Sequence, residues 1–167
     1  MDIKNFSREL AHPVTLVSCK SGNQENLVTV AWAVPVSFSP PLLAVSVSPK
    51  RFSHQLLAES QEFTVIVLAD SQKQLSTLAG TKSGRDLNKW ELPEFADIRL
   101  DGKKVATAGL KGALANLECQ KINQVTAGDH TLFIGEVVYY EADDNQSPLI
   151  LFRRNYHSLG ELIARYP

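Results

Sequence analysis

The sequence predicts a mainly β protein in which an antiparallel barrel carries helices at its periphery. Short β-prone runs recur along the chain, turn-forming clusters separate them, and only two or three segments have helical character. Closing an antiparallel sheet into a barrel removes exposed strand edges, which suits a chain of many short strands. With 167 residues and 44% hydrophobic content, the chain fits a single domain, expected over residues 1–167.

In the first third of the chain, polar or proline-containing segments separate three expected strands. Residues 5–12 predict a short helical turn that ends before Pro13. The strands are rich in β-branched and apolar residues and cover 14–19, 27–34 and 42–47. The polar run 20–25 favours a hairpin loop longer than two residues, and Pro40-Pro41 marks a corner before the third strand.

Two helices are expected in the middle of the chain. Residues 53–60 follow a capping pattern that begins at Ser53, and they place apolar side chains on one helical face. Residues 70–79 form the second expected helix, with Asp70 or Ser71 as its cap.

Further strands complete the expected barrel. They cover residues 62–68, 113–124, 130–141 and 149–152. The polar, glycine-bearing run 81–91 predicts an ordered loop or a short helix, and turns are expected at 127–129 and 143–147.

Composition excludes several classes of protein. The 17 basic and 18 acidic side chains leave a net charge of −1, so no global field attracts nucleic acid or a membrane surface. No apolar segment follows Met1 and no run of 18 apolar residues occurs, which predicts a cytoplasmic protein without a membrane span. Cys19 and Cys119 lack disulfide or metal-ligand spacing, so we expect no metal site.

A candidate phosphate site follows the third strand. Hydroxyls, an ammonium, a guanidinium and a helix start all suit a dianion, and they come from Ser46, Ser48, Lys50, Arg51, Ser53 and His54. A solvated turn followed by an ordinary helix cap explains the same residues, so the pattern alone leaves both interpretations open. Glycine loops of dinucleotide and triphosphate sites and the Gly-x-Ser-x-Gly nucleophile motif do not occur.

Trp32 and His130 each allow two interpretations. Trp32 fits a core or interface position, while main-chain amides of residues 29–33 could bind the edge of a planar heterocycle. His130 follows a turn, where it could donate to a ligand, or it could be a half-exposed histidine beside a turn aspartate.

The chain resembles the flavin reductase-like family of flavin mononucleotide-binding split barrels. The segments that carry the resemblance in the first third are 26–32 (NLVTVAW), 37–41 (SFSPP), 45–48 (VSVS) and 51–54 (RFSH). Later segments follow in the same order, namely 59–65 (ESQEFTV), 83–86 (SGRD) with Lys89-Trp90, 128–130 (GDH), 135–137 (GEV) and 149–159. The resemblance covers nearly the whole chain and implies an antiparallel split β-barrel of the FMN-binding type.

The resemblance also implies a set of cofactor-binding residues. Those expected along the isoalloxazine ring and ribityl chain are Asn26, Thr29, Val30, Ala31, Trp32 and Ala33. Those expected around the ribityl chain and phosphate are Ser46, Val47, Ser48, Lys50, Ser53 and His54, with Ser83, Gly84 and Lys89 closing over that end. His130 is the expected catalytic residue, near the nicotinamide or the flavin face, and Tyr156 is expected at the cleft rim.

The implied function is an oxidoreductase that passes hydride from NADH or NADPH to FMN, with FAD as an alternative flavin. A homodimer and a monooxygenase or other electron acceptor are the expected partners. The alternative is a non-catalytic FMN-binding electron carrier or flavin store, because no nicotinamide-binding motif is recognisable. A split barrel without a ligand is a third reading, which the hydroxyl and basic residues disfavour.

Overall fold

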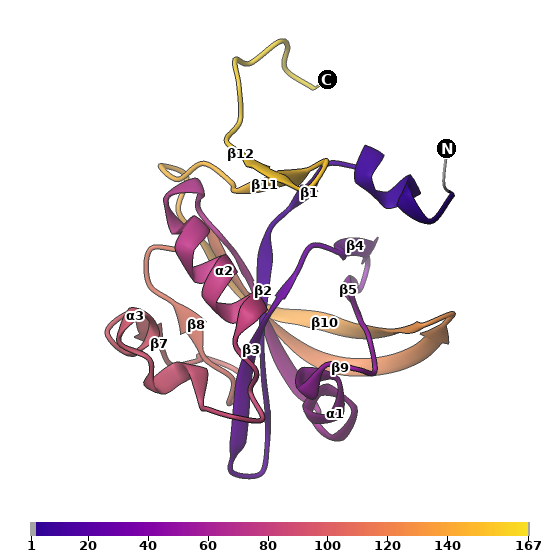
Figure 1. Ribbon diagram of the computed structural model, residues 1–167, viewed down its shortest axis with the longest axis vertical. Coiled ribbons are helices and arrows are strands. Elements are labelled where there is room, and N and C mark those ends of the chain that lie inside the picture. Colours follow the sequence, from indigo (N-terminus) through magenta and orange to yellow (C-terminus); the bar gives the residue numbers. More distant parts are fainter. Residues whose placement is uncertain (1–2, 167) are drawn as a thin grey trace.

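The computed structural model describes residues 3–166 and consists mainly of antiparallel sheets with helices at their periphery (Figure 1). The largest sheet has seven strands in the order β3-β2-β6-β9-β10-β5-β4. Its strands are β2 (Thr15–Ser21), β3 (Gln24–Val30), β4 (Ala33–Phe38), β5 (Pro41–Val47), β6 (Glu62–Val67), β9 (Ala115–Ala127) and β10 (His130–Ala142). The predicted antiparallel, mainly β fold class is therefore confirmed. The sheet is open, with β3 and β4 as its two edges within residues 3–166.

Within residues 3–166, two smaller sheets and six helical segments complete the fold. One small sheet contains β1 (His12–Pro13), β11 (Ile150–Phe152) and β12 (Asn155–His157), and the other contains β7 (Arg99–Leu100) and β8 (Gly109–Leu110). The helical segments are η1 (Ile3–Glu9), α1 (Phe52–Glu59), η2 (Asp70–Gln72), α2 (Lys73–Thr81), η3 (Lys89–Glu91) and α3 (Pro93–Ala96). Within residues 3–166, none of these helices is long and apolar enough to cross a bilayer.

Strand alternation divides the hydrophobic core into two clusters. Neighbouring residues of β2 belong to different clusters, since Leu16 packs in one and Val17 in the other. Successive side chains of a strand point to opposite faces, so the β3-β2-β6 part of the sheet separates the two clusters. Helix α2 contributes Leu75 to the first cluster and α1 contributes Leu56 to the second. The two helices therefore cover opposite faces of this sheet.

The first hairpin is tighter than predicted. Ser21 pairs directly with Gln24, which leaves only Gly22 and Asn23 in the turn. Gly22 has a φ of 55°, a left-handed conformation that glycine adopts without steric cost. The prediction of a longer loop was wrong, because the polar residues on both sides of the turn belong to the paired strands β2 and β3.

The expected strand at residues 27–34 is interrupted in the structure. Strand β3 ends at Val30 and β4 begins at Ala33, so Ala31 and Trp32 form a break between the two edge strands. The main-chain carbonyl of Trp32 accepts a hydrogen bond of 2.9 Å from the Ser46 amide of β5. The break thus lies beside the end of β5, where the candidate site residues Ser46, Val47 and Ser48 are located.

The start of α1 also differs from the prediction. Arg51, not Ser53, occupies the N-cap position, and its side chain makes no capping hydrogen bond. Ser53 lies inside the first helical turn and is fully buried. Its hydroxyl oxygen accepts a hydrogen bond from the side chain of Asn26 on β3. Four short elements, β12, α3, β7 and β8, were not predicted, because their lengths give little periodic signal in the sequence.

Candidate functional site

A cavity of about 490 Å³ lies where β3, the break after it and the end of β5 meet. We call it the strand cavity. It is lined by Val28, Thr29, Val30, Ala31, Trp32, Ser46, Val47, Ser48, Lys50, Arg51 and His130. Its valines are buried core residues of β3 and β5, and hydroxyl side chains alternate with them. This mixture of apolar walls with a few polar groups is typical of a site for a planar organic ligand.

Trp32 and His130 form one side of the strand cavity. Their ring centroids are 5.0 Å apart, with an angle of 48° between the ring planes. The Nδ1 atom of His130 lies 2.7 Å from Oδ1 of Asp129, and this hydrogen bond lowers the pKa of the Asp129 carboxyl. The carboxylate and the indole together restrict the orientation of the imidazole.

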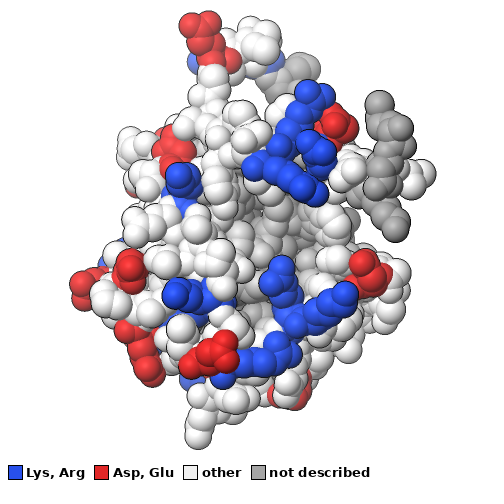
Figure 2. All heavy atoms as spheres, viewed as in Figure 1, with Lys and Arg blue, Asp and Glu red and all other residues white. Residues whose placement is uncertain are grey.

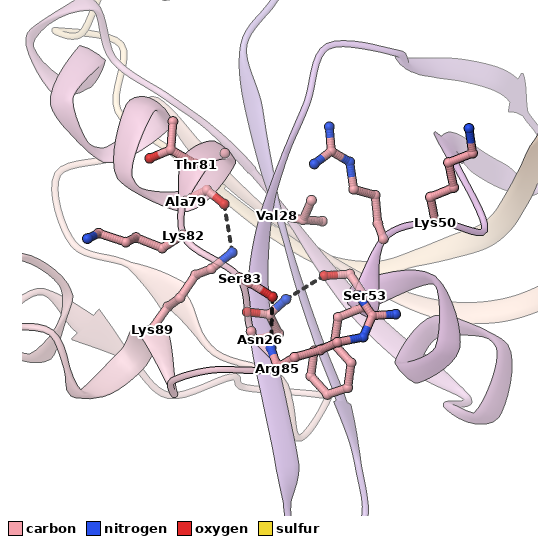
Figure 3. Close-up of a pocket in the computed structure, with 14 residues that line it drawn as sticks. Asn26, Val28, Lys50, Ser53, Ala79, Thr81, Lys82, Ser83, Arg85 and Lys89 are labelled. Carbon is pink, nitrogen blue, oxygen red and sulfur yellow. Dashed lines mark hydrogen bonds between the residues drawn. The ribbon is translucent and has the colours of Figure 1, made fainter.

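A second, smaller cavity of about 120 Å³ adjoins the first (Figure 3). We call it the loop cavity, because the end of α2 and the loop after it, residues 80–85, form one of its sides. Val28, Lys50 and Arg51 line both cavities, so the two are neighbours along the same surface. The other lining residues are Asn26, Phe52, Ser53, Ala79, Gly80, Thr81, Lys82, Ser83, Gly84, Arg85 and Lys89.

Basic side chains surround the loop cavity. Lys50 and Arg51 precede α1, and Lys82 and Arg85 lie on the opposite segment (Figure 3). The guanidinium of Arg85 lies 5.7 Å from the centroid of the Phe52 ring, which links the two sides. Ammonium and guanidinium groups with nearby hydroxyls favour a phosphate dianion.

Asn26 and Ser53 join β3 to α1 at the base of the loop cavity. The Asn26 Nδ2 atom donates a hydrogen bond of 2.7 Å to Ser53 Oγ, and both residues are buried. The Oδ1 atom of Asn26 is also buried and has no hydrogen-bond partner among the described residues. An unpaired buried acceptor is costly, so this atom fits a ligand that brings a hydroxyl donor.

Lys89 is buried at the same cavity and has two main-chain partners. Its Nζ atom donates to the carbonyl of Leu27 at 2.5 Å and to that of Ala79 at 2.7 Å. These bonds tie the last turn of α2 to β3. Burial disfavours the charged form and lowers the pKa of Lys89 to about 8. An ammonium group has three donors, so one remains available to a ligand.

Three of the expected site residues lie outside both cavities. Ala33 begins β4 and pairs with Val45. His54 places Nε2 2.8 Å from Thr131 Oγ1, and burial lowers the pKa of its imidazole. Tyr156 lies on β12, and its hydroxyl is 3.0 Å from Ser76 Oγ of α2. These three residues therefore line neither cavity, and their predicted role in cofactor binding stays a prediction.

The remaining expected residues line one cavity or the other, although they come from distant parts of the chain. Thr81, Lys82 and Arg85 line the loop cavity but are not among the site residues predicted from the sequence. The signal was present, because these residues flank Ser83 and Gly84 in the same polar run.

Comparisons with known proteins show what the chain is similar to. The family described as "Flavin reductase like domain" matches residues 6–160. The chain is 30% identical to the NADH:riboflavin 5'-phosphate oxidoreductase of Streptomyces pristinaespiralis, with 90% of this chain and 82% of that protein covered. It is 37% identical to an uncharacterized protein of Archaeoglobus fulgidus, over 81% of this chain and 76% of the relative.

A solved structure shows the same arrangement of the chain. BorF, the flavin reductase component of a bacterial two-component tryptophan halogenase, superposes with a TM-score of 0.84 at 27% identity. The match covers 96% of this chain and 98% of BorF.

Proposed function

This chain belongs to the flavin reductase-like domain family, and we propose that it is an NAD(P)H-dependent reductase of flavin mononucleotide. The observation that carries the proposal is the continuity of the two cavities through Val28, Lys50 and Arg51. An apolar-walled site for a ring system thus leads directly into a basic site for a phosphate.

The residues of both cavities fit a flavin nucleotide. The larger cavity, between the valines of β3 and β5, suits the isoalloxazine ring. The unpaired Oδ1 of Asn26 suits a ribityl hydroxyl, and the basic side chains of the loop cavity suit a terminal phosphate. The volume of about 120 Å³ in the loop cavity favours FMN. FAD, the alternative, would have to extend its adenosine half beyond this cavity.

The protein's contribution to the reaction is to bind and orient two nucleotides. The bound flavin supplies the ring that accepts a hydride from nicotinamide. Val28, Val30 and Val47 exclude water from one side of the strand cavity. Asp129 and Trp32 hold the His130 imidazole at the cavity, where it orients the nicotinamide group. Holding two reactants in a reactive geometry is itself a large part of catalysis.

A homodimer is part of the proposal. The edge strand β4 exposes Val34, Val36 and Phe38, and Phe38 is 96% accessible. An exposed apolar edge strand is a ready site for pairing with another chain. Because β4 begins directly after Trp32, a second copy on this edge would cover the apolar side of the strand cavity.

The electrons need an acceptor, and the names of two relatives indicate its class. BorF is the flavin reductase component of a two-component tryptophan halogenase, and a relative from Thermus thermophilus is the reductase component of 4-hydroxyphenylacetate 3-monooxygenase. We propose that reduced flavin from this protein serves a monooxygenase or another flavin-dependent acceptor. In this proposal the seven-stranded sheet corresponds to the split barrel. The cytoplasmic location stays a prediction.

The test is the visible spectrum of the purified protein after addition of FMN, desalting and anaerobic titration with NADH or NADPH. Retained flavin that bleaches at a rate above that of free FMN supports the reductase. Retained flavin that stays oxidised would instead support the electron carrier or flavin store. If the protein neither retains FMN nor accelerates its reduction, the proposed function is wrong.

A further inference from the structure

A third cavity, of about 240 Å³, is lined by Trp32 and by none of the loop cavity's basic residues. We call it the arginine cavity. It shares Ala31 and Trp32 with the strand cavity, so a ligand that fills one can continue into the other. Arg8, His12, Arg153 and Arg154 are also among its lining residues.

The arginine cavity is positively charged. No acidic side chain lines it among residues 3–166. Arg153 is paired with Glu9 by hydrogen bonds of 3.0 and 2.6 Å, whereas Arg8 and Arg154 form no ion pair with a described residue. Figure 2 shows basic side chains in two groups on either side of a hollow in this face. The groups match the two basic cavities that flank the strand cavity.

His12 adds an unsatisfied polar atom to this cavity. It lines the cavity from β1, and its Nε2 atom is buried without a hydrogen-bond partner among the described residues. Buried polar atoms normally have partners, so a ligand with a hydrogen-bonding group fits here.

The turn that carries the two arginines is itself unusual. Arg153 and Arg154 connect β11 to β12 with φ values of 49° and 65°. Asparagine and glycine are preferred at these positions of a tight hairpin, because a larger side chain is strained in the left-handed region. The Arg153 amide donates to the Arg8 carbonyl at 3.2 Å, which holds η1 against the turn and brings Arg8 to the cavity.

We propose that the arginine cavity binds the phosphate groups of the nicotinamide dinucleotide while its nicotinamide ring enters the strand cavity. This inference rests on the proposed function. A hydride donor must reach the flavin ring and bring at least two negative charges with it. The cations of the loop cavity are taken by the flavin phosphate in that proposal. Among the described residues, Arg8 and Arg154 are then cations without an ion pair in the cavity that adjoins the strand cavity.

The test compares the wild type with Arg154→Gln in steady-state oxidation of NADH and of NADPH at saturating FMN. Loss of a charge-assisted contact predicts a rise of about tenfold in KM with kcat little changed. Inhibition by ADP-ribose and by 2'-phospho-ADP-ribose, measured in the same assay, should weaken by a similar factor. An effect on both nucleotides assigns Arg154 to the shared pyrophosphate, and an effect on NADPH alone assigns it to the 2'-phosphate.

Two further variants separate binding from folding. Arg154→Gly removes the charge and relieves the left-handed strain, so it should raise KM equally while leaving the melting temperature the same or higher. Lys103→Gln removes one positive charge from an exposed position outside these cavities and should leave KM unchanged.

An unchanged KM and unchanged inhibition in both Arg154 variants would overturn the inference. Fluorescence titration of FMN should give the wild-type Kd in each variant. A wild type that binds no FMN or oxidises neither nucleotide would instead refute the proposed function.

Discussion

Gly84 lies directly against the side-chain amide of Asn26, so that a Cβ atom on residue 84 would be only 2.4 Å from Asn26 Oδ1. No real Cβ keeps such a distance from a neighbouring atom. The loop after α2 therefore approaches β3 as closely as it does because residue 84 has no side chain. This contact sets the shape of the loop cavity and the position of the unpaired Asn26 acceptor.

Gly84→Ala should weaken FMN binding. The added methyl group must displace the Asn26 amide, which is held at the other end by its bond to Ser53. We expect the Kd for FMN, from fluorescence quenching, to rise about tenfold or more, and stability to fall by roughly 1–3 kcal/mol. Gly160→Ala is the matched control, because a Cβ there meets no atom within 4 Å. Wild-type affinity in Gly84→Ala would contradict the packing described here.

Lys89→Met should destabilise the protein. The substitution removes the two hydrogen bonds that Lys89 donates to the carbonyls of Leu27 and Ala79. The free energy of unfolding, measured with urea at pH 7, should fall by roughly 1–3 kcal/mol. Lys103→Met, at an exposed position, should cost far less. An equal loss of unfolding free energy in the two variants would show that the buried hydrogen bonds of Lys89 do not stabilise the protein.

The contribution of Lys89 to the stability of the protein should also depend on pH. Burial lowers the pKa of Lys89 from its ordinary 10.5 to about 8, so between these values the unfolded chain binds the proton more strongly than the native protein. Stability rises with pH wherever the unfolded state holds more protons. The wild type should therefore gain stability relative to Lys89→Met from pH 8 to 10.5. A difference that stays flat or falls over this range would refute the lowered pKa.

His130→Asn should slow hydride transfer without loss of FMN. The imidazole is held by Asp129 and Trp32 at the strand cavity, whereas the phosphate-binding side chains lie elsewhere. We expect kcat/KM for NADH to fall by roughly ten- to a hundredfold through misplacement of the donor, with the Kd for FMN within about twofold. His157→Asn, on β12 and outside the three cavities, should keep wild-type rates. Normal turnover in His130→Asn would remove His130 from the reaction.

Val36→Asp should dissociate the proposed dimer. Val36 is half exposed on the edge strand β4, and a buried carboxylate at a subunit interface would be unpaired. Size-exclusion chromatography with light scattering should give the mass of two chains for the wild type and of one for the variant. Gln74→Asp, on the exposed side of α2, should remain dimeric. A wild type with the mass of one chain at micromolar concentration would refute the homodimer.

The sequence alone predicted most of the elements because their signals are local. The β-prone runs became β2, β5, β6, β9 and β10, and the capped amphipathic segments became α1 and α2. The order of the motifs along the chain was enough to identify the family. The chemistry of the side chains, together with the family resemblance, was enough to predict many residues of the strand cavity. Each element and each short motif depends on residues that are close together in the chain.

The tertiary structure decided how these residues meet. It joins the two cavities through Val28, Lys50 and Arg51, and it turns Ser53 from an expected cap into a buried partner of Asn26. It also brings the arginine turn to Trp32, more than a hundred residues away in the chain. Such contacts depend on strand register and core packing across the whole sheet, and local residue patterns do not encode register between distant strands.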